Sequence, residues 1–320
     1  MSSDASCPPD LTIAVCTWNR AASLRRTLQS FRALDTFPGA AHEILVVDNN
    51  SSDDTAAVLA DFAGALPLRV VHEPRQGLSH ARNRAVAAAR GQAILWTDDD
   101  VQVRADWLVA YATALHRHPE ADLFGGVIRP QFEGRPPRWL RTGWTLVQDA
   151  YAARDLGPTD FELEPVVAQL PYGANFAVRT ALLRRYRFDP ALGVVASERR
   201  VGDETALLAR MMRDGARGRW VAGAVVQHRV PRERQRLDFV RAHYRAAGRV
   251  LRSLALPLAS GLTPPAPPRR PARLERRRRR ALRACYLKRA LLRAPAQWLP
   301  HLVEAERLRG ELEAARAGGR

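Results

Sequence analysis

The chain has 320 residues, a formal net charge of +17 and a hydrophobic fraction of 46%. This length allows a well-buried core in one large domain or two ordinary ones, and the composition is typical of a soluble globular protein. No apolar run of about 18 residues is present, so no transmembrane helix is predicted. The opening residues, MSSDASCPPD, are polar and acidic and do not predict a secretory signal.

The positive charge is concentrated towards the C-terminus. Residues 1–248 hold 32 basic and 28 acidic side chains, whereas residues 249–320 hold 18 basic and 5 acidic side chains. The first part is therefore nearly neutral. Such asymmetry suggests an anionic partner for the tail alone, either a nucleic acid, an anionic membrane surface or an acidic protein.

The three cysteines are far apart and odd in number: Cys7, Cys16 and Cys285. They predict neither a disulfide framework nor a cysteine metal site. A reducing, cytoplasmic setting is the expectation that follows.

The first 120 residues alternate short apolar runs with helical patterns. Strands are predicted at 11–17, 43–49, 68–73 and 93–100, and helices at 21–34, 53–63, 79–90 and 104–118. This alternation is typical of βαβ units and a parallel sheet. The strands are continuous apolar runs, as expected when helices cover both faces of the sheet.

The second half is less regular. Strands are predicted at 123–130, 172–179 and 220–228, and helices at 203–213 and 236–254. Residues 131–170 carry several Pro and Gly and predict a long loop or lid. The run TPPAPPRRP at 263–271 is typical of a Pro-rich linker, and an Arg-rich helix at 272–294 and a shorter helix at 301–316 are expected after it.

Polar side chains follow three of the predicted strands. The runs are Thr17-Trp18-Asn19-Arg20, Asp48-Asn49-Asn50 and Asp98-Asp99-Asp100. Ligands of open α/β sheets bind at the carboxyl ends of the strands. The sequence therefore predicts a ligand site where these three runs meet.

The acidic run at 98–100 is the strongest chemical signal. Three consecutive carboxylates repel one another, and a cation, hydrogen bonds or solvent must offset this. On an extended chain Asp98 and Asp100 point to one side and Asp99 to the other. Paired carboxylates suit Mg²⁺ or Mn²⁺, which often complete their coordination with substrate phosphates. The alternative is a solvated acidic loop or a cap for the next helix.

Six segments, in order within residues 11–245, together resemble the family 2 glycosyltransferases. They are IAVCTWNR (13–20), EILVVDNNSSDDT (43–55), EPRQGLSHARNRAVAAARG (73–91), AILWTDDDV (93–101), YGANFAVR (172–179) and GDETALLARM (202–211). The resemblance implies an α/β GT-A fold with a Rossmann-like, mostly parallel sheet flanked by helices. It also implies inverting sugar transfer from a nucleoside-diphosphate sugar, with Mn²⁺ or Mg²⁺ as cofactor.

The resemblance also implies a domain layout. Residues 1–255 would form the GT-A domain, with a nucleotide-binding half at 11–120 and an acceptor half at 121–255. Residues 256–271 would be the linker, and residues 272–320 a basic helical tail.

For the donor, the resemblance implies roles position by position. Residues that would bind the nucleotide sugar are Thr17, Asn19, Arg20, Asp48, Arg82, Asp98 and Asp99. Arg75 is a weaker second candidate beside Arg82. Residues that would hold the metal are Asp100, Asp98 and His228, although a lone histidine is more often structural.

The catalytic base is implied to lie at Asp203-Glu204. Family members usually carry Glu-Asp here, and the pair is inverted in this chain. By register Glu204 occupies the base position, and by chemical type Asp203 does; Glu204 is the slightly favoured choice. The alternative is that both acids only stabilise a helix N-terminus.

Three further residues carry open alternatives. Asn175 could shape the acceptor or sugar pocket, or it could be a turn residue. Trp139 and Trp144 could stack on a sugar ring, or they could anchor their loop to the core.

The tail has two readings as well. The five arginines at 276–280 lie in a helical pattern with leucines, which suits either peripheral contact with the inner face of the plasma membrane or packing on the catalytic body.

Competing functions remain. A nucleotidyltransferase would also use acidic metal ligands, but a Gly-rich basic phosphate loop is missing near the N-terminus. A nucleic-acid-binding protein is unlikely because the body is nearly neutral. An inactive relative of the fold would be consistent with the inverted acidic pair. The acceptor could be a glycan, a lipid-linked molecule or a small molecule.

Overall fold

The computed structural model describes residues 10–195, 201–250, 254, 256–257, 271–291 and 293–317. Cys7 and most of the predicted linker lie outside these residues. The strands are β1 Leu11–Thr17, β2 His42–Asp48, β3 Leu68–His72, β4 Ala93–Asp98, β5 Val101–Val103, β6 Leu123–Phe132, β7 Phe161–Leu163, β8 Asn175–Arg179 and β9 Gly218–Val230.

Helices surround these strands. The α-helices are α1 Ala21–Phe31, α2 Thr55–Phe62, α3 Leu78–Ala88, α4 Trp107–Arg117, α5 Arg138–Thr142, α6 Trp144–Val147, α7 Thr180–Leu183, α8 Asp203–Arg213, α9 Leu237–Val250, α10 Pro271–Ala290 and α11 Pro295–Ala317. Short 3-10 helices are η1 Gln148–Tyr151, η2 Val167–Gln169 and η3 Arg232–Arg234.

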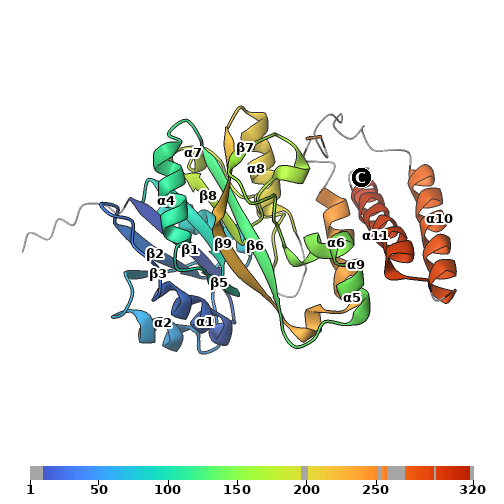
Figure 1. Cartoon of the computed structure of the whole chain (residues 1–320), viewed down its shortest axis with the longest axis horizontal. Helices are drawn as coiled ribbons and strands as arrows, with labels where there is room; N and C mark the ends of the chain where they lie inside the picture. Colours follow the sequence, from blue (N-terminus) through green and yellow to red (C-terminus); the bar gives the residue numbers. More distant parts are fainter. Residues whose placement is uncertain are drawn as a thin grey trace, which may run out of the picture.

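The strands form one sheet in the order β3-β2-β1-β4-β8-β6-β9-β5, with β7 paired to β9 (Figure 1). The strands β3, β2, β1 and β4 are parallel, as predicted from the alternation of strands and helices. β8 then runs antiparallel to both β4 and β6, and β5 and β7 run antiparallel to β9. The predicted α/β sheet with flanking helices is confirmed, and its second half adds antiparallel pairs that the sequence did not predict.

Both faces of the sheet are buried. In β1, Ile13 and Val15 pack into one apolar cluster with residues of α1, α2 and α4. Ala14, between them, faces the opposite cluster, which includes residues of α3 and α8. Successive side chains of a strand point to opposite faces, so a continuous apolar strand requires cover on both sides. The apolar runs of the sequence have this physical cause.

Residues 131–170 are more ordered than the predicted loop or lid. They contain α5, α6, two 3-10 helices and β7. Their aromatic side chains explain the difference, because Trp144 packs edge-on against Phe132 and lies beside Tyr151. Trp144 thus anchors this segment to its neighbours. Leu140 and Val147 are fully buried in the same cluster.

The C-terminal helices pack on the rest of the chain. α11 lies against α9, and α10 covers α11 as the outermost helix (Figure 1). Trp298, Leu299 and Leu302 of α11 enter the cluster that contains Tyr244 of α9. The tail is therefore not a free basic arm.

Two glycines permit the close approach of α9 and α11. A Cβ on Gly310 would overlap the carbonyl oxygen of Arg245, and one on Gly248 would overlap that of Arg307. Small residues at a helix crossing allow the two backbones to approach closely. The Arg245 side chain then pairs with Glu313, and Arg241 Nε lies 3.0 Å from Glu306 Oε1.

Candidate active site

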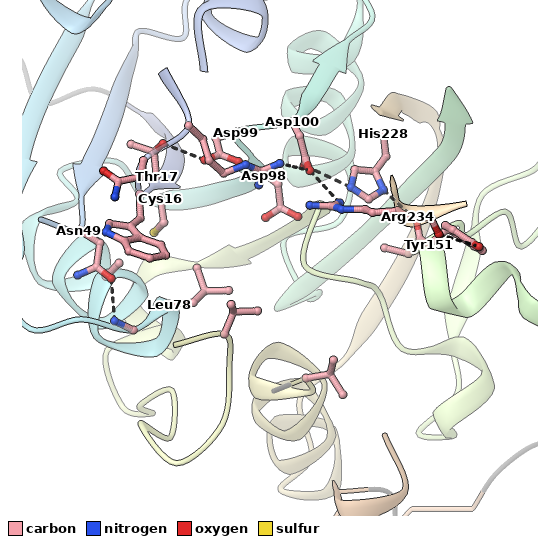
Figure 2. A pocket seen from close by; sticks show the side chains of 18 of the residues that line it. Cys16, Thr17, Asn49, Leu78, Asp98, Asp99, Asp100, Tyr151, His228 and Arg234 are labelled. Carbon is pink, nitrogen blue, oxygen red and sulfur yellow. Dashed lines mark hydrogen bonds and ion pairs between the residues drawn. The ribbon is translucent and has the colours of Figure 1, made fainter. Parts of the chain in front are cut away.

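The carboxyl ends of β1 and β4 open into a cavity of about 540 Å³ (Figure 2). This volume lies in the range of small-ligand sites, about 300–1,000 Å³. Because β1 and β4 are parallel neighbours, Thr17 at the end of β1 meets, at the same edge, the aspartate that ends β4 and the two that follow it. Residues that line the cavity include Thr17, Asn19, Arg20, Asn49, Gln76, Asp98, Asp99, Asp100, Tyr151, His228 and Arg234.

Arginines neutralise the buried aspartates. Arg20 lies 2.6 Å from both Asp99 Oδ1 and Asp100 Oδ2. Arg234, which follows β9, lies 3.1 Å from Asp100 Oδ2. Thr17 Oγ1 also donates to Asp99 Oδ2 at 2.8 Å. The repulsion within the acidic run is thus offset by cations and a hydrogen bond rather than by solvent.

The three carboxyl groups are electrostatically distinct. Burial raises the pKa of Asp99 to about 7, although Arg20 opposes this. Burial also raises the pKa of Asp98. Burial acts on Asp100 in the same direction, but His228, Arg20 and Arg234 outweigh it and hold its pKa well below the usual range. Asp100 is therefore the firmly ionised member of the run.

His228 lies on β9 beside Asp100, at 3.2 Å from its Nε2 to Asp100 Oδ1. Its Nδ1 lies 2.8 Å from the carbonyl oxygen of Tyr151, which fixes the ring orientation. Burial alone would lower the pKa of His228, but the Asp100 carboxylate raises it overall. The register between β5 and β9, in which Val101 pairs with His228, creates this contact.

The donor atoms of this region suit a divalent cation. Asp98, Asp100 and His228 offer carboxylate oxygens and an imidazole, which are ligands that Mn²⁺ and Mg²⁺ accept. The Asp98 side chain is 35% exposed, and its Oδ1 lies 3.8 Å from Arg82 Nη2. However, across the described ranges of the chain no three acidic, histidine or cysteine side chains are already arranged around one point for an ion. The metal site remains a prediction.

The opposite wall of the cavity is polar and built from two loops. Asn49 donates to the carbonyl oxygens of Glu73 and Arg75 and accepts from the Gly77 amide at 2.8 Å. Gln76 Nε2 donates to the Asn49 carbonyl oxygen at 2.8 Å. These bonds fix the loop between β3 and α3 against the end of β2.

Other predicted donor-binding residues are placed less directly. Asp48 does not line the cavity, and its Oδ1 accepts from the Ser51 amide at 3.0 Å. The Asn19 side-chain oxygen accepts from the Ser52 amide at 2.7 Å, although the residue reaches the cavity wall. Arg75 pairs with Glu73 at 2.8 Å, and 67% of its side chain is exposed. Asn49, from the polar run after β2, and Gln76, which no sequence pattern indicated, lie on the cavity wall.

A second cavity of about 270 Å³ adjoins the first and shares Asp98 with it. Arg82 of α3 lies between the two. Its Nη1 is 2.6 Å from Asp203 Oδ2 and 3.3 Å from Glu204 Oε2. Arg82 therefore connects the aspartate run with the acidic pair at the start of α8.

The two acids of this pair differ in exposure. The Asp203 side chain is 3% exposed, and that of Glu204 is 16% exposed and faces the second cavity. Burial and the adjacent Asp203 charge raise the pKa of Glu204 to about 8, although Arg82 opposes them. Both acids line the second cavity, and Glu204 is the more exposed of the two.

Gly173 provides the space that Arg82 and Glu204 occupy. A Cβ there would lie 2.5 Å from Arg82 Nη2 and 3.3 Å from the Glu204 carboxyl carbon. The Gly173 amide also donates to Glu204 Oε1 at 3.4 Å.

Residues far along the chain complete the second cavity. Asp149, Tyr172, His243, Tyr244 and Arg307 line it, and none was selected from the sequence. The Arg307 guanidinium of α11 lies over the Tyr244 ring at 4.9 Å. Tyr172 opens the YGANFAVR segment, and the other four lie outside the segments that carry the family resemblance. Arg307 joins them only because α11 packs on α9.

Asn175 lies in the core instead of in either cavity. It is fully buried, accepts from Trp107 Nε1 at 2.8 Å and from Tyr111 Oη at 2.9 Å, and donates to the Val127 and Ala224 carbonyl oxygens. All of its polar capacity is used to join β6, β8, β9 and α4. Its role is structural.

Comparison with known sequences identifies relatives. The family model described as glycosyl transferase family 2 matches residues 12–187. The succinoglycan biosynthesis protein ExoM of Rhizobium meliloti (strain 1021) is 30% identical over 135 residues, 42% of this chain and 43% of that protein. The pre-mycofactocin glycosyltransferase of Mycobacterium tuberculosis (strain ATCC 25618 / H37Rv) is 27% identical over 226 residues, 68% of this chain and 42% of that protein. The matches span less than half the length of these relatives.

Solved structures share the fold. A mannosyltransferase from Pyrobaculum calidifontis in complex with GDP-Man and Mn²⁺ has a TM-score of 0.51 at 20% identity, over 98% of this chain and 76% of that chain. GalNAc-T7 with UDP, GalNAc and Mn²⁺ has a TM-score of 0.53 at 16% identity, over 80% and 53% of the two chains. These likenesses confirm the GT-A fold. Because the family model covers more than half of the sequence, the chain belongs to glycosyl transferase family 2.

Proposed function

We propose that this protein transfers a sugar from a nucleoside-diphosphate sugar to a hydroxyl acceptor, with inversion at the anomeric carbon. One observation carries the proposal: a buried aspartate run lines one cavity, and Glu204 faces an adjoining cavity across Asp98 and Arg82. This arrangement supplies separate places for a leaving diphosphate and for a general base. Inverting transfer needs both, on opposite sides of the reacting carbon.

The first cavity would hold the donor. Thr17 and Gln76 would offer hydrogen bonds to a base or ribose, and Arg20 and Arg234 would bind diphosphate oxygens. Guanidinium groups bind phosphate with charge-assisted, often bidentate hydrogen bonds. The neighbours solved with UDP or GDP-Man support this class of donor.

Asp98, Asp100 and His228 would hold Mn²⁺ or Mg²⁺. When bound, the ion would stabilise the charge that develops on the leaving diphosphate. Asp100 is already ionised, which favours this role. For the ion to bind, Arg20 and Arg234 would have to give up part of their contact with the Asp100 carboxylate. The neighbours that contain Mn²⁺ support the choice of metal.

Glu204 would act as the base. Its carboxylate would take the proton from the acceptor hydroxyl while the hydroxyl oxygen forms a bond to the anomeric carbon and the bond to the diphosphate breaks. A base must approach within about 3 Å of the hydroxyl oxygen. Arg82 and the Gly173 amide orient the Glu204 carboxylate, and Asp203 fixes Arg82.

The second cavity would receive the acceptor. Its wall carries Asp149, Tyr172, Tyr244 and Arg307, so polar and aromatic groups are both available to a hydroxyl-bearing molecule. The names of two relatives refer to succinoglycan biosynthesis and to glycosyl transfer involving pre-mycofactocin. We propose a role in cell-surface glycan or glycolipid synthesis for this chain.

An assay with UDP-, GDP- and dTDP-sugars, divalent metal and simple glycan acceptors tests the proposal. Release of a nucleoside diphosphate together with a glycosylated product of inverted configuration is expected. Release of pyrophosphate from a nucleoside triphosphate would indicate a nucleotidyltransferase instead. Donor binding without any product across the panel would favour the inactive relative.

A further inference from the structure

The outer face of α10 combines cations with exposed apolar side chains. Of the five exposed large apolar side chains in the described ranges, three lie at the end of this helix. Tyr286 is 59% exposed, Leu287 63% and Leu291 59%. Side chains of this size are normally buried, so a contiguous group of them on a surface indicates a contact site.

The arginines before them share this face. Residues three and four apart lie on the same side of a helix, and Arg276, Arg280, Arg283 and Leu287 follow that spacing. The opposite stripe, formed by Leu274, Ala281 and Cys285, is buried against the rest of the protein. The outer face therefore runs from a basic stripe, Arg276, Arg280 and Arg283, to an apolar tip, Leu287 and Leu291, at the end of the helix and just after it. Tyr286 borders this tip, and its side chain is hydrogen-bonded to Arg241 of α9.

Carboxylates do not neutralise the basic stripe. Within the described chain, the arginines of α10 that form ion pairs are Arg277 with Glu304, and Arg278 and Arg279 with Glu275. Arg276, Arg280 and Arg283 take part in none of them. These three arginines are exposed on α10, which is the outermost helix of the molecule (Figure 1).

We propose that this face of α10 docks on an anionic lipid surface. Arginines would approach the lipid headgroups, while the two leucines would enter the interface between headgroups and acyl chains. A nucleic acid would be recognised by the basic stripe alone and would leave the apolar tip unexplained. No helix of the described chain is long and apolar enough to span a membrane, so the contact would be peripheral.

Docking through α10 would also determine where the second cavity lies relative to the membrane. α10 packs on α11, and α11 supplies Arg307 to the cavity wall. Lipid binding through α10 would thus hold the proposed acceptor cavity close to the membrane. The docking itself does not depend on the proposed transferase activity.

Vesicle flotation of the full chain tests this inference. Vesicles of phosphatidylcholine, with and without phosphatidylglycerol, would be compared at low and high salt. Binding is expected only to the anionic vesicles and should weaken with salt. The variant Arg276→Glu, Arg280→Glu, Arg283→Glu should bind about 100-fold more weakly, since each arginine near an anionic surface contributes about fivefold.

Two further variants make the result specific. Leu287→Ser, Leu291→Ser should also lose binding, because it removes the apolar tip and leaves the charge. Arg32→Glu, Arg84→Glu, Arg90→Glu makes the same charge change at exposed positions elsewhere and should bind like the parent. Unchanged nucleotide binding in all three would show that they fold.

Three outcomes would overturn the inference: vesicle binding that survives both α10 variants, binding that the control variant loses equally, or no binding to anionic vesicles. Tighter binding to duplex DNA or RNA that depends on the arginines but not on the leucines would assign the face to nucleic acid. Self-association lost in the apolar variant, without vesicle binding, would assign it to a second copy of the chain.

Discussion

Glu204 is the residue on which the proposed chemistry depends most. Replacing it by Gln keeps the size and removes the base, so the turnover rate should fall by about 10²–10⁴-fold. Donor affinity should stay near the parent value because Glu204 faces the second cavity and not the first. Steady-state kinetics and a nucleotide titration of Glu204→Gln measure the two effects.

Asp203→Asn is the matched control. Asp203 is buried against Arg82 at 2.6 Å, and breaking a buried ion pair costs about 3–5 kcal/mol. This variant should therefore melt at a lower temperature, whereas Glu204→Gln should melt like the parent. If Asp203→Asn were inactive at full stability and Glu204→Gln remained active, the base would be Asp203.

The raised pKa of Glu204 predicts a pH dependence. With its pKa near 8, the carboxyl group is mostly protonated at neutral pH in the ligand-free protein and cannot accept a proton. The rate constant kcat/KM, which reports groups of the free enzyme, should therefore rise with pH and level off above about 8. A profile that is flat between neutral and alkaline pH would contradict this role for Glu204.

At the scale of elements, the crossing of α9 and α11 is the most constrained contact. Gly310→Ala places a methyl group against the Arg245 carbonyl oxygen, which is backbone and cannot move aside alone. Such overpacking costs about 1–3 kcal/mol. Thermal melts should show a lower midpoint for this variant, and Gly64→Ala, which meets no atom within 4 Å, should leave it unchanged. Equal midpoints for the two variants would argue against this packing.

The same crossing brings Arg307 to the second cavity. Arg307→Gln should raise the KM for the acceptor and leave the affinity for the nucleotide unchanged, because the residue lines only the second cavity. Separate titrations of donor and acceptor distinguish these effects. A weakened donor affinity with an unaltered acceptor KM would contradict the prediction that α11 contributes to the acceptor site.

The strands and the cavity residues also differ in how well they could be predicted from the sequence. The parallel strands and the aspartates after β4 were predictable, because apolar runs and polar strand ends are local signals. Arg234 and Tyr151 reach the same cavity through the pairing of β9 and the aromatic packing of residues 131–170, which no local pattern records. The role predicted for Asp48 stays a prediction, and its carboxylate accepts a hydrogen bond from the Ser51 amide of its own turn.

For the whole molecule, the question is whether the tail is separable from the GT-A domain, as the sequence predicted. Trp298, Leu299 and Leu302 share a buried cluster with Tyr244. Removing residues 271–320 would expose that cluster, at about 1.5–3 kcal/mol for each large side chain. We expect the truncated chain to melt at a lower temperature and to bind a hydrophobic dye. A truncated chain with the parent's melting temperature would establish the tail as independent.

The central claim is that the aspartate run binds a nucleoside diphosphate together with a divalent metal. Calorimetric titration of the full chain with UDP, GDP and dTDP, each with Mn²⁺ and each with a chelator, tests it most directly. We predict that one of the three nucleotides binds with micromolar affinity in Mn²⁺ and that the chelator removes this binding. Absence of binding for all three nucleotides, with metal and without it, would contradict the claim and reduce the aspartate run to a structural ion-pair cluster.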